Sequence, residues 1–504
     1  MFRIFGPPGT GKTTTLLNMV DKALEQGVHP HRIAFLAFTK KAATEAKERA
    51  AQRFNLDPKK DLMFFRTLHS LALTMSDIRP EQVMQPENYR ELGNVIGISL
   101  NESKIQAMDD IQDLVSTSDP ILGLINLTRL KKSDLRKEYN RSNLEQDWNT
   151  IKYVDECLRE YKTNLGLYDF TDMLQEFVNQ SGKYCPKFDL CFLDEAQDLS
   201  ALQWDIAHIL DDNSDRMYAA GDDDQAIYRW AGADVDHFIN LPGGSETLSQ
   251  SFRVPRQVHT IAEGVVRRIT RRFPKRYEPK DEPGNVTRID TITGLDMSQG
   301  TWLILSQAGY QLNPVAADLR SSGYLFNYRG HRSISEKISE AVNGWEQMRQ
   351  GKEITGDVAR KIYSFMSIGD RVKRGFKKLP SLQDDDLVSM ADLTEKHGLL
   401  ATDDMLWSEA MNKLPETDRA YITALLRRKE KFNGIPRITA STIHGAKGGE
   451  AENVVLFTDI SPAADEEMRR NPDDMHRVFY VGVTRTKQNL YIVEPEDVSR
   501  SYDL

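Results

Sequence analysis

Two short stretches of the sequence carry residue types suited to phosphate chemistry. The first is GPPGTGKT at 6–13, a glycine, four further residues and then Gly-Lys-Thr. Such a loop wraps backbone N–H groups around phosphates, and the helix that follows adds the positive end of its dipole. Lys12 would then reach the β- and γ-phosphates, and the Thr13 hydroxyl would bind Mg²⁺. The predicted nucleotide-binding loop consists of Gly6, Pro7, Pro8, Gly9, Thr10, Gly11, Lys12, Thr13 and Thr14.

The second stretch is FDLCFLDEAQD at 188–198, an apolar run that ends in two acids. Ligands of parallel sheets bind beyond the carboxyl ends of the strands, which is where these acids would lie. Asp194 fits a Mg²⁺-linked position, and Glu195 fits a base that activates water for attack on a γ-phosphate. Alone, the pair could equally complement a helix dipole. The glycine-rich loop at 6–13 favours the catalytic interpretation.

The elements that must position these residues predict an α/β fold. Apolar runs that we interpret as strands alternate with helical patterns. This alternation is typical of a parallel sheet with helices on its faces. A second series of this kind starts near residue 255, and a polar, mostly helical stretch interrupts each series. We therefore expect a first core at 1–75 and 181–254, a helical insertion at 76–180, a second core at 255–330 and 433–504, and a second, reduced insertion at 331–432.

Composition indicates a globular protein. Apolar residues make up 39% of the 504 positions and charged residues 28%, which argues against a disordered chain. We find no apolar run of about 18 residues that could span a membrane and no secretory signal at the start. Three cysteines (Cys157, Cys185 and Cys191) are too few and too poorly spaced for a disulfide framework or a zinc site. These features predict a reducing, cytoplasmic setting.

The net charge of −9 argues against a protein that simply coats DNA. It does not exclude a nucleic-acid motor, because such an enzyme can hold a strand in a locally basic groove. Basic clusters occur at 267–277 and 371–378. Each of them could be solvated surface or a contact to a strand.

The stretch GDDDQAIYRW at 221–230 combines two properties that rarely occur together. Asp222, Asp223 and Asp224 form an acid run of the kind found in solvated loops. Tyr228 and Trp230 follow within a few residues, and paired aromatics usually mark a core.

Eight motifs, in this order, resemble those of the UvrD/Rep/PcrA-type superfamily 1 helicases. They are GPPGTGKT, AFTKKAATEAKER, RTLHSLA, FLDEAQD, GDDDQAIYRWAGA, LSQSFR, STIHGAKGGEAENVV and FYVGVTRT. The stretches at 167–174 and 321–330 resemble the family more weakly, and the two insertions match it poorly. The resemblance implies two RecA-like P-loop cores, with ATP and Mg²⁺ as cofactors.

The resemblance also implies roles at the nucleotide. Gln225 is similar to a glutamine that senses the γ-phosphate, and Arg253 and Arg485 to two arginines that reach it from separate motifs. Such an arginine finger raises the rate about 10³–10⁵-fold in other phosphoryl-transfer systems. In isolation, each arginine would read as a surface ion pair. Glu450 resembles a contact to the nucleotide sugar, and the implied catalytic set is Lys12, Glu195, Gln225, Arg253 and Arg485.

Because Arg485 lies on the second core, this resemblance places ATP in the cleft between the cores. Closing and opening of that cleft would be the power stroke.

A strand-binding set is implied in the same way: Phe38, Thr39, Thr67, His69, Tyr228, Trp230, Thr442 and His444. Aromatic side chains stack on any base at about 1–3 kcal/mol per base, and hydroxyls and imidazoles suit phosphate contacts. Phe38 ends an apolar strand, so a core role for it is equally open.

The sequence departs from the family at the adenine site. The family usually has a glutamine motif before the P-loop, and only five residues precede Gly6 here. Phe252 stands where the family often has a tyrosine that stacks on adenine, and stacking alone discriminates poorly between bases. Either the start of the chain is shortened or the adenine is held differently. We therefore expect relaxed nucleotide specificity, with ATP still preferred because of its abundance. Ser251, Gly449 and Ala451 also differ from frequent family residues, which should alter packing more than chemistry.

The function that these features predict is an ATP-driven helicase or translocase on single-stranded DNA. The resemblance implies 3′–5′ movement, single-stranded and tailed duplex DNA as substrates, and protein partners in replication, repair or recombination. The alternative is a nucleotide-gated switch that binds a single strand with little processive unwinding. A helicase–nuclease would need a further domain, and only about twenty residues follow Arg485. RNA as the track is a lesser alternative.

Overall fold

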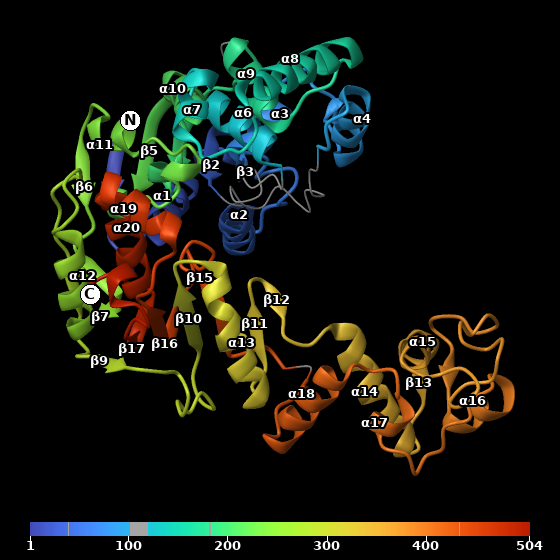
Figure 1. Ribbon diagram of the computed structural model, residues 1–504. Coiled ribbons are helices and arrows are strands. Elements are labelled where there is room, and N and C mark those ends of the chain that lie inside the picture. Colours follow the sequence, from blue (N-terminus) through green and yellow to red (C-terminus); the bar gives the residue numbers. More distant parts are fainter. Residues whose placement is uncertain (39, 101–118, 181–182, 433) are drawn as a thin grey trace. The chain divides into compact units, whose positions relative to one another are not determined.

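The described part of the chain folds around two large β-sheets, each in a unit of its own (Figure 1). The computed structural model describes residues 1–504 except residues 39, 101–118, 181–182 and 433. Unit 1 comprises Met1–Pro283 and Glu466–Thr484, and unit 2 comprises Gly284–Asp465 and Arg485–Leu504. Residues 255–283 and 466–484 thus group with unit 1, whereas the sequence suggested a second core that begins at 255.

The sheet of unit 1 is parallel throughout, as the strand–helix alternation predicts. Its strand order is β3-β2-β4-β5-β1-β6. The strands are β1 (Phe2–Phe5), β2 (Ile33–Ala37), β3 (Phe65–Thr67), β4 (Phe188–Leu193), β5 (Ser214–Gly221) and β6 (Ser245–Thr247).

Strand β2 shows why this sheet is covered on both faces. All five of its residues are buried, and successive side chains of a strand point to opposite faces. Phe35 packs with Leu16 and other residues of one apolar cluster, whereas Leu36 packs with Leu202 in another. Helices α1 (Lys12–Glu25) and α2 (Lys40–Phe54) supply the first cluster, and α3 (Leu68–Thr74) and α10 (Ala201–Asp212) supply the second.

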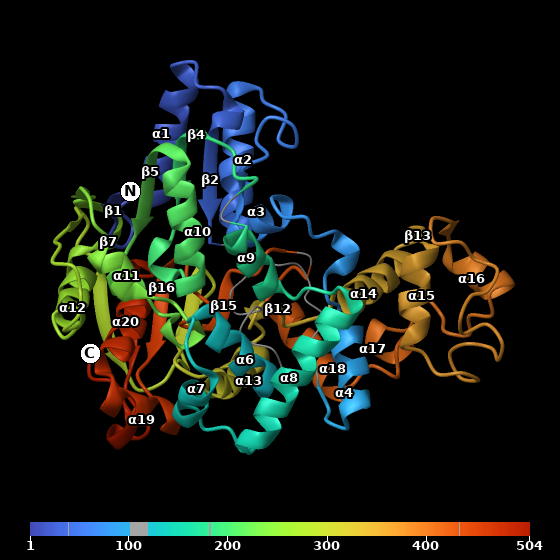
Figure 2. The same cartoon turned by 90° about the horizontal axis from the view of Figure 1, so that it is seen from above.

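The first insertion is helical where the structure describes it, and it has an apolar core of its own. Asp147 caps one helix by accepting a hydrogen bond from the Asn149 N–H, and Asp169 and Asp172 form a capping box on another. Helix α4 packs against α8 (Figure 2). The helices are α4 (Pro86–Ile96), α6 (Pro120–Leu130), α7 (Leu135–Arg141), α8 (Trp148–Leu165) and α9 (Phe170–Asn179).

The sheet of unit 2 has the order β12-β11-β15-β10-β16-β17-β9, and its pairings are parallel except for the β11–β12 hairpin. Helix α13 (Leu312–Ser321) follows β10. The strands are β9 (Asn285–Ile289), β10 (Trp302–Ser306), β11 (Phe326–Tyr328), β12 (His331–Arg332), β15 (Ile438–Thr442), β16 (Ala451–Phe457) and β17 (Thr486–Val493). The predicted α/β class with parallel sheets is confirmed.

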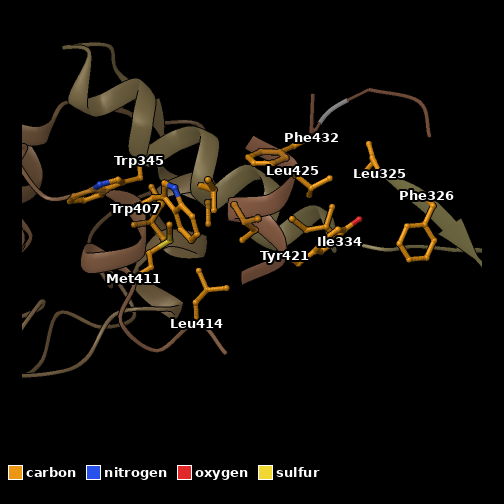
Figure 3. Packing of buried hydrophobic residues seen from close by; sticks show 14 of the residues in the cluster. Leu325, Phe326, Ile334, Trp345, Trp407, Met411, Leu414, Tyr421, Leu425 and Phe432 are labelled. Carbon is orange, nitrogen blue, oxygen red and sulfur yellow. The ribbon is translucent and has the colours of Figure 1, made fainter. Parts of the chain in front are cut away.

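The second insertion continues the core of unit 2. One apolar cluster runs from Phe326 on β11 through Tyr421 and Leu425 to Trp345 and Trp407 (Figure 3). The elements of this region are α14 (Glu336–Arg349), β13 (Ile354–Thr355), α15 (Gly356–Ser364), β14 (Leu387–Val388), α16 (Met390–Lys396), α17 (Trp407–Ala410) and α18 (Glu416–Arg427).

The last elements of unit 1 come from two distant parts of the sequence. Strands β7 (Gln250–Pro255) and β8 (Glu278–Lys280) pair in parallel, and α12 (Arg256–Val266) packs against α20 (Pro472–Val483). Helix α19 (Pro462–Arg470) precedes α20 in the chain. Within the described part of the chain, no helix is long and apolar enough to cross a membrane.

Candidate active site and nucleic-acid interface

The glycine-rich loop lies between β1 and α1, as the sequence predicts. The Gly6 N–H donates to the Gly221 carbonyl across the sheet, and the Lys12 ammonium donates to the Gly6 carbonyl at 2.9 Å. A Cβ on Gly6 would lie 1.8 Å from Lys12 Cγ, so only glycine leaves room for this lysine. Gly9 and Gly11 have φ values of 72° and 77°, a region that favours glycine. The loop therefore has the shape that wraps phosphates.

Asp194 at the end of β4 meets this loop. Its carboxylate accepts a hydrogen bond from the Thr13 hydroxyl at 2.6 Å and lies almost fully buried. Burial, together with the neighbouring Glu195 carboxylate, raises the pKa of Asp194 to about 6, and Thr13 and Lys12 act in the opposite direction. A hydroxyl and a carboxylate are the oxygen ligands that Mg²⁺ prefers. The residues present therefore fit Mg²⁺, which would also favour the ionised form of Asp194.

Glu195 is held in an unusual backbone conformation. Its φ of 55° and ψ of 41° fall in the left-handed region, which a residue with a side chain rarely adopts. The carboxylate lies 4.0 Å from the Lys12 ammonium and accepts a hydrogen bond from Gln197 Nε2 at 2.6 Å. The strained turn thus directs Glu195 toward the end of the loop where phosphates would bind.

A chain of hydrogen bonds links Glu195 to Gln225. Gln197 donates to Glu195 through Nε2, and its Oε1 accepts from the Asp222 N–H at 2.9 Å. The Asp222 carboxylate in turn accepts from Gln225 Nε2 at 2.6 Å. The predicted base and the predicted γ-phosphate sensor are therefore joined through two intervening residues, the side chain of Gln197 and the backbone N–H and carboxylate of Asp222. Neither of these was among the predicted site residues.

The three aspartates that follow β5 are buried, and each is at most 1% exposed. The Lys275 side chain, itself 1% exposed, has its ammonium 3.0 Å from Asp222, 2.5 Å from Asp223 and 2.7 Å from Asp224. Burial raises the pKa of Asp223 to about 6, although Lys275 opposes this shift. The acid run is therefore a neutralised core cluster, not the solvated loop that such runs usually form.

Arginines complete the same cluster. Arg272 donates two hydrogen bonds to Asp224, at 2.7 and 2.6 Å, and with Lys275 it outweighs burial and lowers the pKa of that carboxyl. Arg477 of α20 is fully buried and donates to the Asp223 carbonyl at 2.9 Å. The basic cluster at 267–277 had been interpreted as solvated surface or as a strand contact. For Arg272 and Lys275 both interpretations were wrong, because these side chains pair with the buried aspartates.

The SFR motif also contacts the glycine-rich loop. Ser251 donates to the Pro8 carbonyl at 2.7 Å, and the Phe252 N–H donates to the Gly9 carbonyl at 2.8 Å. A Cβ on Gly9 would lie 2.4 Å from the Cβ of Arg253, so the arginine backbone packs directly on the loop. Phe252 is 75% exposed, which leaves its ring available for stacking.

The remaining predicted nucleotide residues belong to unit 2. Arg485 is buried and donates to the Gly449 carbonyl at 3.3 Å. Glu450 pairs with Lys487, at 2.5 Å between Oε1 and Nζ. Their roles at the phosphates and at the sugar stay predictions.

The predicted strand-binding residues of unit 1 lie in two groups. The rings of Phe38 and Tyr228 are roughly parallel, with centroids 6.0 Å apart, and Trp230 is 47% exposed. Phe38 is also packed against an apolar cluster of the sheet, so both interpretations of this residue have support.

Thr67 ends β3 and His69 lies in the first turn of α3, and both are buried. Thr67 caps α3 by accepting from the Ser70 N–H at 3.3 Å, and burial lowers the pKa of His69 to about 4. His69 is therefore neutral at physiological pH.

Two further predicted contacts, Thr442 and His444, lie in unit 2, where the Gly445 N–H donates to the Thr442 hydroxyl at 3.1 Å. Thr39 lies outside the described residues.

The fold and this loop define the class of protein. A parallel α/β sheet with a glycine-rich loop after its first strand, and an acid pair after β4, is the arrangement of P-loop nucleotide-binding proteins. Comparison with protein families extends this assignment. Residues 2–243 match the UvrD/REP helicase N-terminal domain, and residues 437–493 match the UvrD-like helicase C-terminal domain.

Individual relatives agree. The chain is 25% identical over 301 residues to the ATP-dependent DNA helicase PcrA of Leuconostoc citreum, which covers 56% of this chain and 39% of the relative. It is 24% identical over 604 residues to a probable DNA helicase II homolog of Rickettsia conorii, which covers 98% of this chain and 90% of the relative. The PcrA helicase of Bacillus subtilis is 25% identical over 609 residues, with 96% of this chain and 79% of that helicase covered.

The chain belongs to the UvrD-like helicase family. The matches to the relatives from Leuconostoc citreum, Mycoplasma capricolum and Escherichia coli span 39%, 38% and 38% of the length of those proteins.

Proposed function

We propose that this protein hydrolyses ATP to move along single-stranded DNA in the 3′–5′ direction and to separate the strands of tailed duplexes. The family assignment supports a DNA helicase, and the polarity follows the resemblance to the 3′–5′ members. The observation that carries the proposal is the hydrogen-bonded chain from Glu195 through Gln197 and Asp222 to Gln225. Tyr228 lies three residues further, a span of at most about 11 Å. A change at the nucleotide can therefore reach a base-stacking side chain directly.

The residues of unit 1 have distinct tasks in hydrolysis. The backbone of the glycine-rich loop and Lys12 bind the β- and γ-phosphates of ATP. Thr13 and Asp194 hold Mg²⁺, which when bound neutralises negative charge on those phosphates. Glu195 accepts the proton of the attacking water, and Gln225 orients toward the γ-phosphate. Arg253, whose backbone packs on Gly9, stabilises negative charge on the transferring group. The family resemblance gives Arg485 a role at the γ-phosphate and Glu450 a role at the nucleotide sugar.

The strand is held mainly by stacking. Tyr228 and Phe38 face each other with nearly parallel rings, and Trp230 is half exposed. Since every base has a π-face, such a platform binds single strands of any sequence. Thr67, His69, Thr442 and His444 add polar contacts to the sugar–phosphate backbone.

The nucleotide site is expected to accept several bases. Phe252 is mostly exposed beside the glycine-rich loop, and an aromatic ring stacks on adenine, guanine or cytosine alike. The biological setting would be DNA replication, repair or recombination, with protein partners from those processes.

Strand displacement tests the proposal. Duplexes with either a 3′ or a 5′ single-stranded tail are incubated with the protein, ATP and Mg²⁺, and the Lys12→Ala variant serves as the control. We expect displacement of the 3′-tailed duplex only and none by the variant. Activity on the 5′-tailed duplex alone would overturn the polarity. ATP hydrolysis that single-stranded DNA does not stimulate would overturn the motor function. Stimulated hydrolysis without displacement would favour a nucleotide-gated binding switch.

A further inference from the structure

Unit 1 contains a cavity of about 540 Å³ that the proposed ATP site does not use. Three parts of the chain enclose it: helix α2, the β3–α3 segment, and residues from either end of the first insertion. Thr67, one of the predicted strand contacts, lines it. Cavities of about 300–1,000 Å³ hold small organic ligands, so this one is large enough for a nucleotide.

Apolar side chains form part of the cavity wall, here called its floor, and they are fixed by packing and by a backbone hydrogen bond. Val83 and Met173 line it and belong to one buried cluster, against which Phe170 packs. The Met84 N–H donates to the Tyr168 carbonyl at 2.9 Å, which ties the start of the insertion to its end. A flat, weakly polar ring such as a nucleobase would bury apolar surface against this floor.

Two cations also line the cavity. Lys47 and Arg66 form no ion pair with any residue that the structure describes. Burial lowers the pKa of both, and the charge of Arg66 lowers that of Lys47 further. The Arg66 guanidinium donates through Nη1 to the Ser70 carbonyl at 3.3 Å and to the Thr74 hydroxyl, and its buried Nε has no partner within the described structure. Two partly buried, adjacent positive charges of this kind favour a bound anion.

We infer that this cavity binds a nucleotide, with the base on the floor formed by Val83, Phe170 and Met173 and the phosphate between Lys47 and Arg66. This goes beyond the proposed strand contacts, because the proposed stacking platform consists of Phe38, Tyr228 and Trp230. The ligand can be one nucleotide of a bound single strand, since Thr67 is both a lining residue and a predicted strand contact, or a free nucleoside monophosphate. Both ligands present a base and a phosphate to the cavity.

Two binding measurements separate these sources. The probes are a short fluorescein-labelled oligothymidylate, followed by anisotropy, and thymidine 5′-monophosphate, followed by calorimetry. Both titrations contain saturating ADP and Mg²⁺, so that the glycine-rich loop is occupied. The test variants are Lys47→Gln and Arg66→Gln, which remove charge, and Thr44→Trp, which places a large side chain at an exposed lining position.

Matched controls make the same changes outside the cavity. Lys59→Gln removes a surface charge, and Gln52→Trp adds an indole to an exposed position on α2 that does not line the cavity. Thermal unfolding of every variant shows whether it is folded.

We expect Lys47→Gln and Arg66→Gln each to bind at least one probe about tenfold more weakly, which is the effect of losing a charged hydrogen bond. Thr44→Trp should weaken binding of the same probe because the indole occupies space in the cavity. The controls should stay within about twofold of the original protein. A weaker oligonucleotide complex identifies the strand as the ligand. For Lys47→Gln, the salt dependence of log K should then lose about 0.7 of its slope, the value for one phosphate of a single strand. A weaker monophosphate complex identifies a free nucleotide.

The inference is refuted if folded Lys47→Gln and Arg66→Gln bind both probes as the original protein does, or if the original protein binds neither. The inference rests on the proposed function only in one respect, which is that a bound single strand is one of the two sources of the nucleotide. Absence of DNA-stimulated ATP hydrolysis in the original protein would refute the proposed function, while the monophosphate titration would still decide the cavity.

Discussion

Replacing Lys275 by methionine would remove the positive charge that contacts all three buried aspartates. The ammonium lies 2.5–3.0 Å from Asp222, Asp223 and Asp224, and every partner is at most 1% exposed. Methionine fills a similar volume without the charge. In the variant, Arg272 still neutralises Asp224, but Asp222 and Asp223 lose their cation.

Removing one partner of a buried ion pair costs about 3–5 kcal/mol, because the other charge is left without compensation. We therefore expect Lys275→Met to lower the free energy of unfolding of unit 1 by about 3–5 kcal/mol at about pH 8. The Lys280→Met variant is the matched control. The Lys280 ammonium lies 3.5 Å from the carboxylate of Glu282, which is 66% exposed, and an ion pair with a solvent-exposed partner contributes at most about 1 kcal/mol.

The loss should depend on pH, with a defined sign. The pKa of Asp223 is already raised from 3.8 to about 6 in the folded protein, and loss of Lys275 would raise it further. A carboxyl with a raised pKa binds its proton more tightly in the folded state, so its destabilising effect appears as pH rises through the window between the two values. The variant should therefore recover part of its stability as the pH is lowered from about 8 toward about 6, where Asp223 takes up its proton.

Urea unfolding at about pH 8 and about pH 5.5, followed by tryptophan fluorescence, measures this effect. Adding Asp223→Asn to Lys275→Met should restore part of the loss, because it removes one uncompensated charge. Either of two results would refute the reasoning: a loss below about 1 kcal/mol at the higher pH, or an equal loss at both pH values.

Four further predictions concern the proposed activity. Arg253→Ala should lower ATP hydrolysis by about 10³-fold with nucleotide affinity nearly unchanged; steady-state kinetics and ADP binding check this, and an effect on affinity alone would contradict it. Trp230→Ala should weaken single-strand binding by about 1–3 kcal/mol and abolish DNA stimulation, while the melting temperature stays near the original because the side chain is half exposed; a loss of folding would indicate a core residue instead. Gln197→Leu interrupts the hydrogen-bonded chain, so basal hydrolysis and its stimulation by DNA should both fall, with nucleotide binding kept; an unchanged ratio of stimulated to basal rate would show that the chain transmits nothing. Rates with ATP, GTP and CTP side by side should be comparable, and a hundredfold preference for ATP would refute relaxed specificity.

The apolar strands of both sheets were predictable because burial on two faces produces continuous apolar runs. Strands β2 and β10 are five buried residues each, and such runs stand out in the sequence. Strands β6 and β9 lie at sheet edges and are mostly exposed or half-exposed, so they carry no such run and were not predicted. The hairpin of β11 and β12 was missed for the same reason, since its strands have three and two residues.

The site was predictable only where its parts are local in sequence. The glycine-rich loop and Asp194 each belong to a short pattern, and the structure brings them within a hydrogen bond of each other. The partners of the aspartates are not local: Lys275 is about fifty residues away and Arg477 more than two hundred and fifty. A run of acids predicts a solvated loop unless those distant cations are known to be there. The basic residues at 267–277 were visible, but their pairing with 222–224 was not.

Helix α20 has a consequence for how the protein is made. Unit 1 requires residues 466–484, yet its other residues end at Pro283. Ribosomes add about 5–20 residues per second, so the intervening two hundred residues take roughly 10–40 s to synthesise. During that interval the nascent first unit lacks Arg477 and the other buried side chains of α20, and the face of α12 that packs against α20 is bare. An N-terminal fragment that stops at Pro283 should therefore be a client for chaperones, and its cluster around Asp223 would lack the hydrogen bond from Arg477.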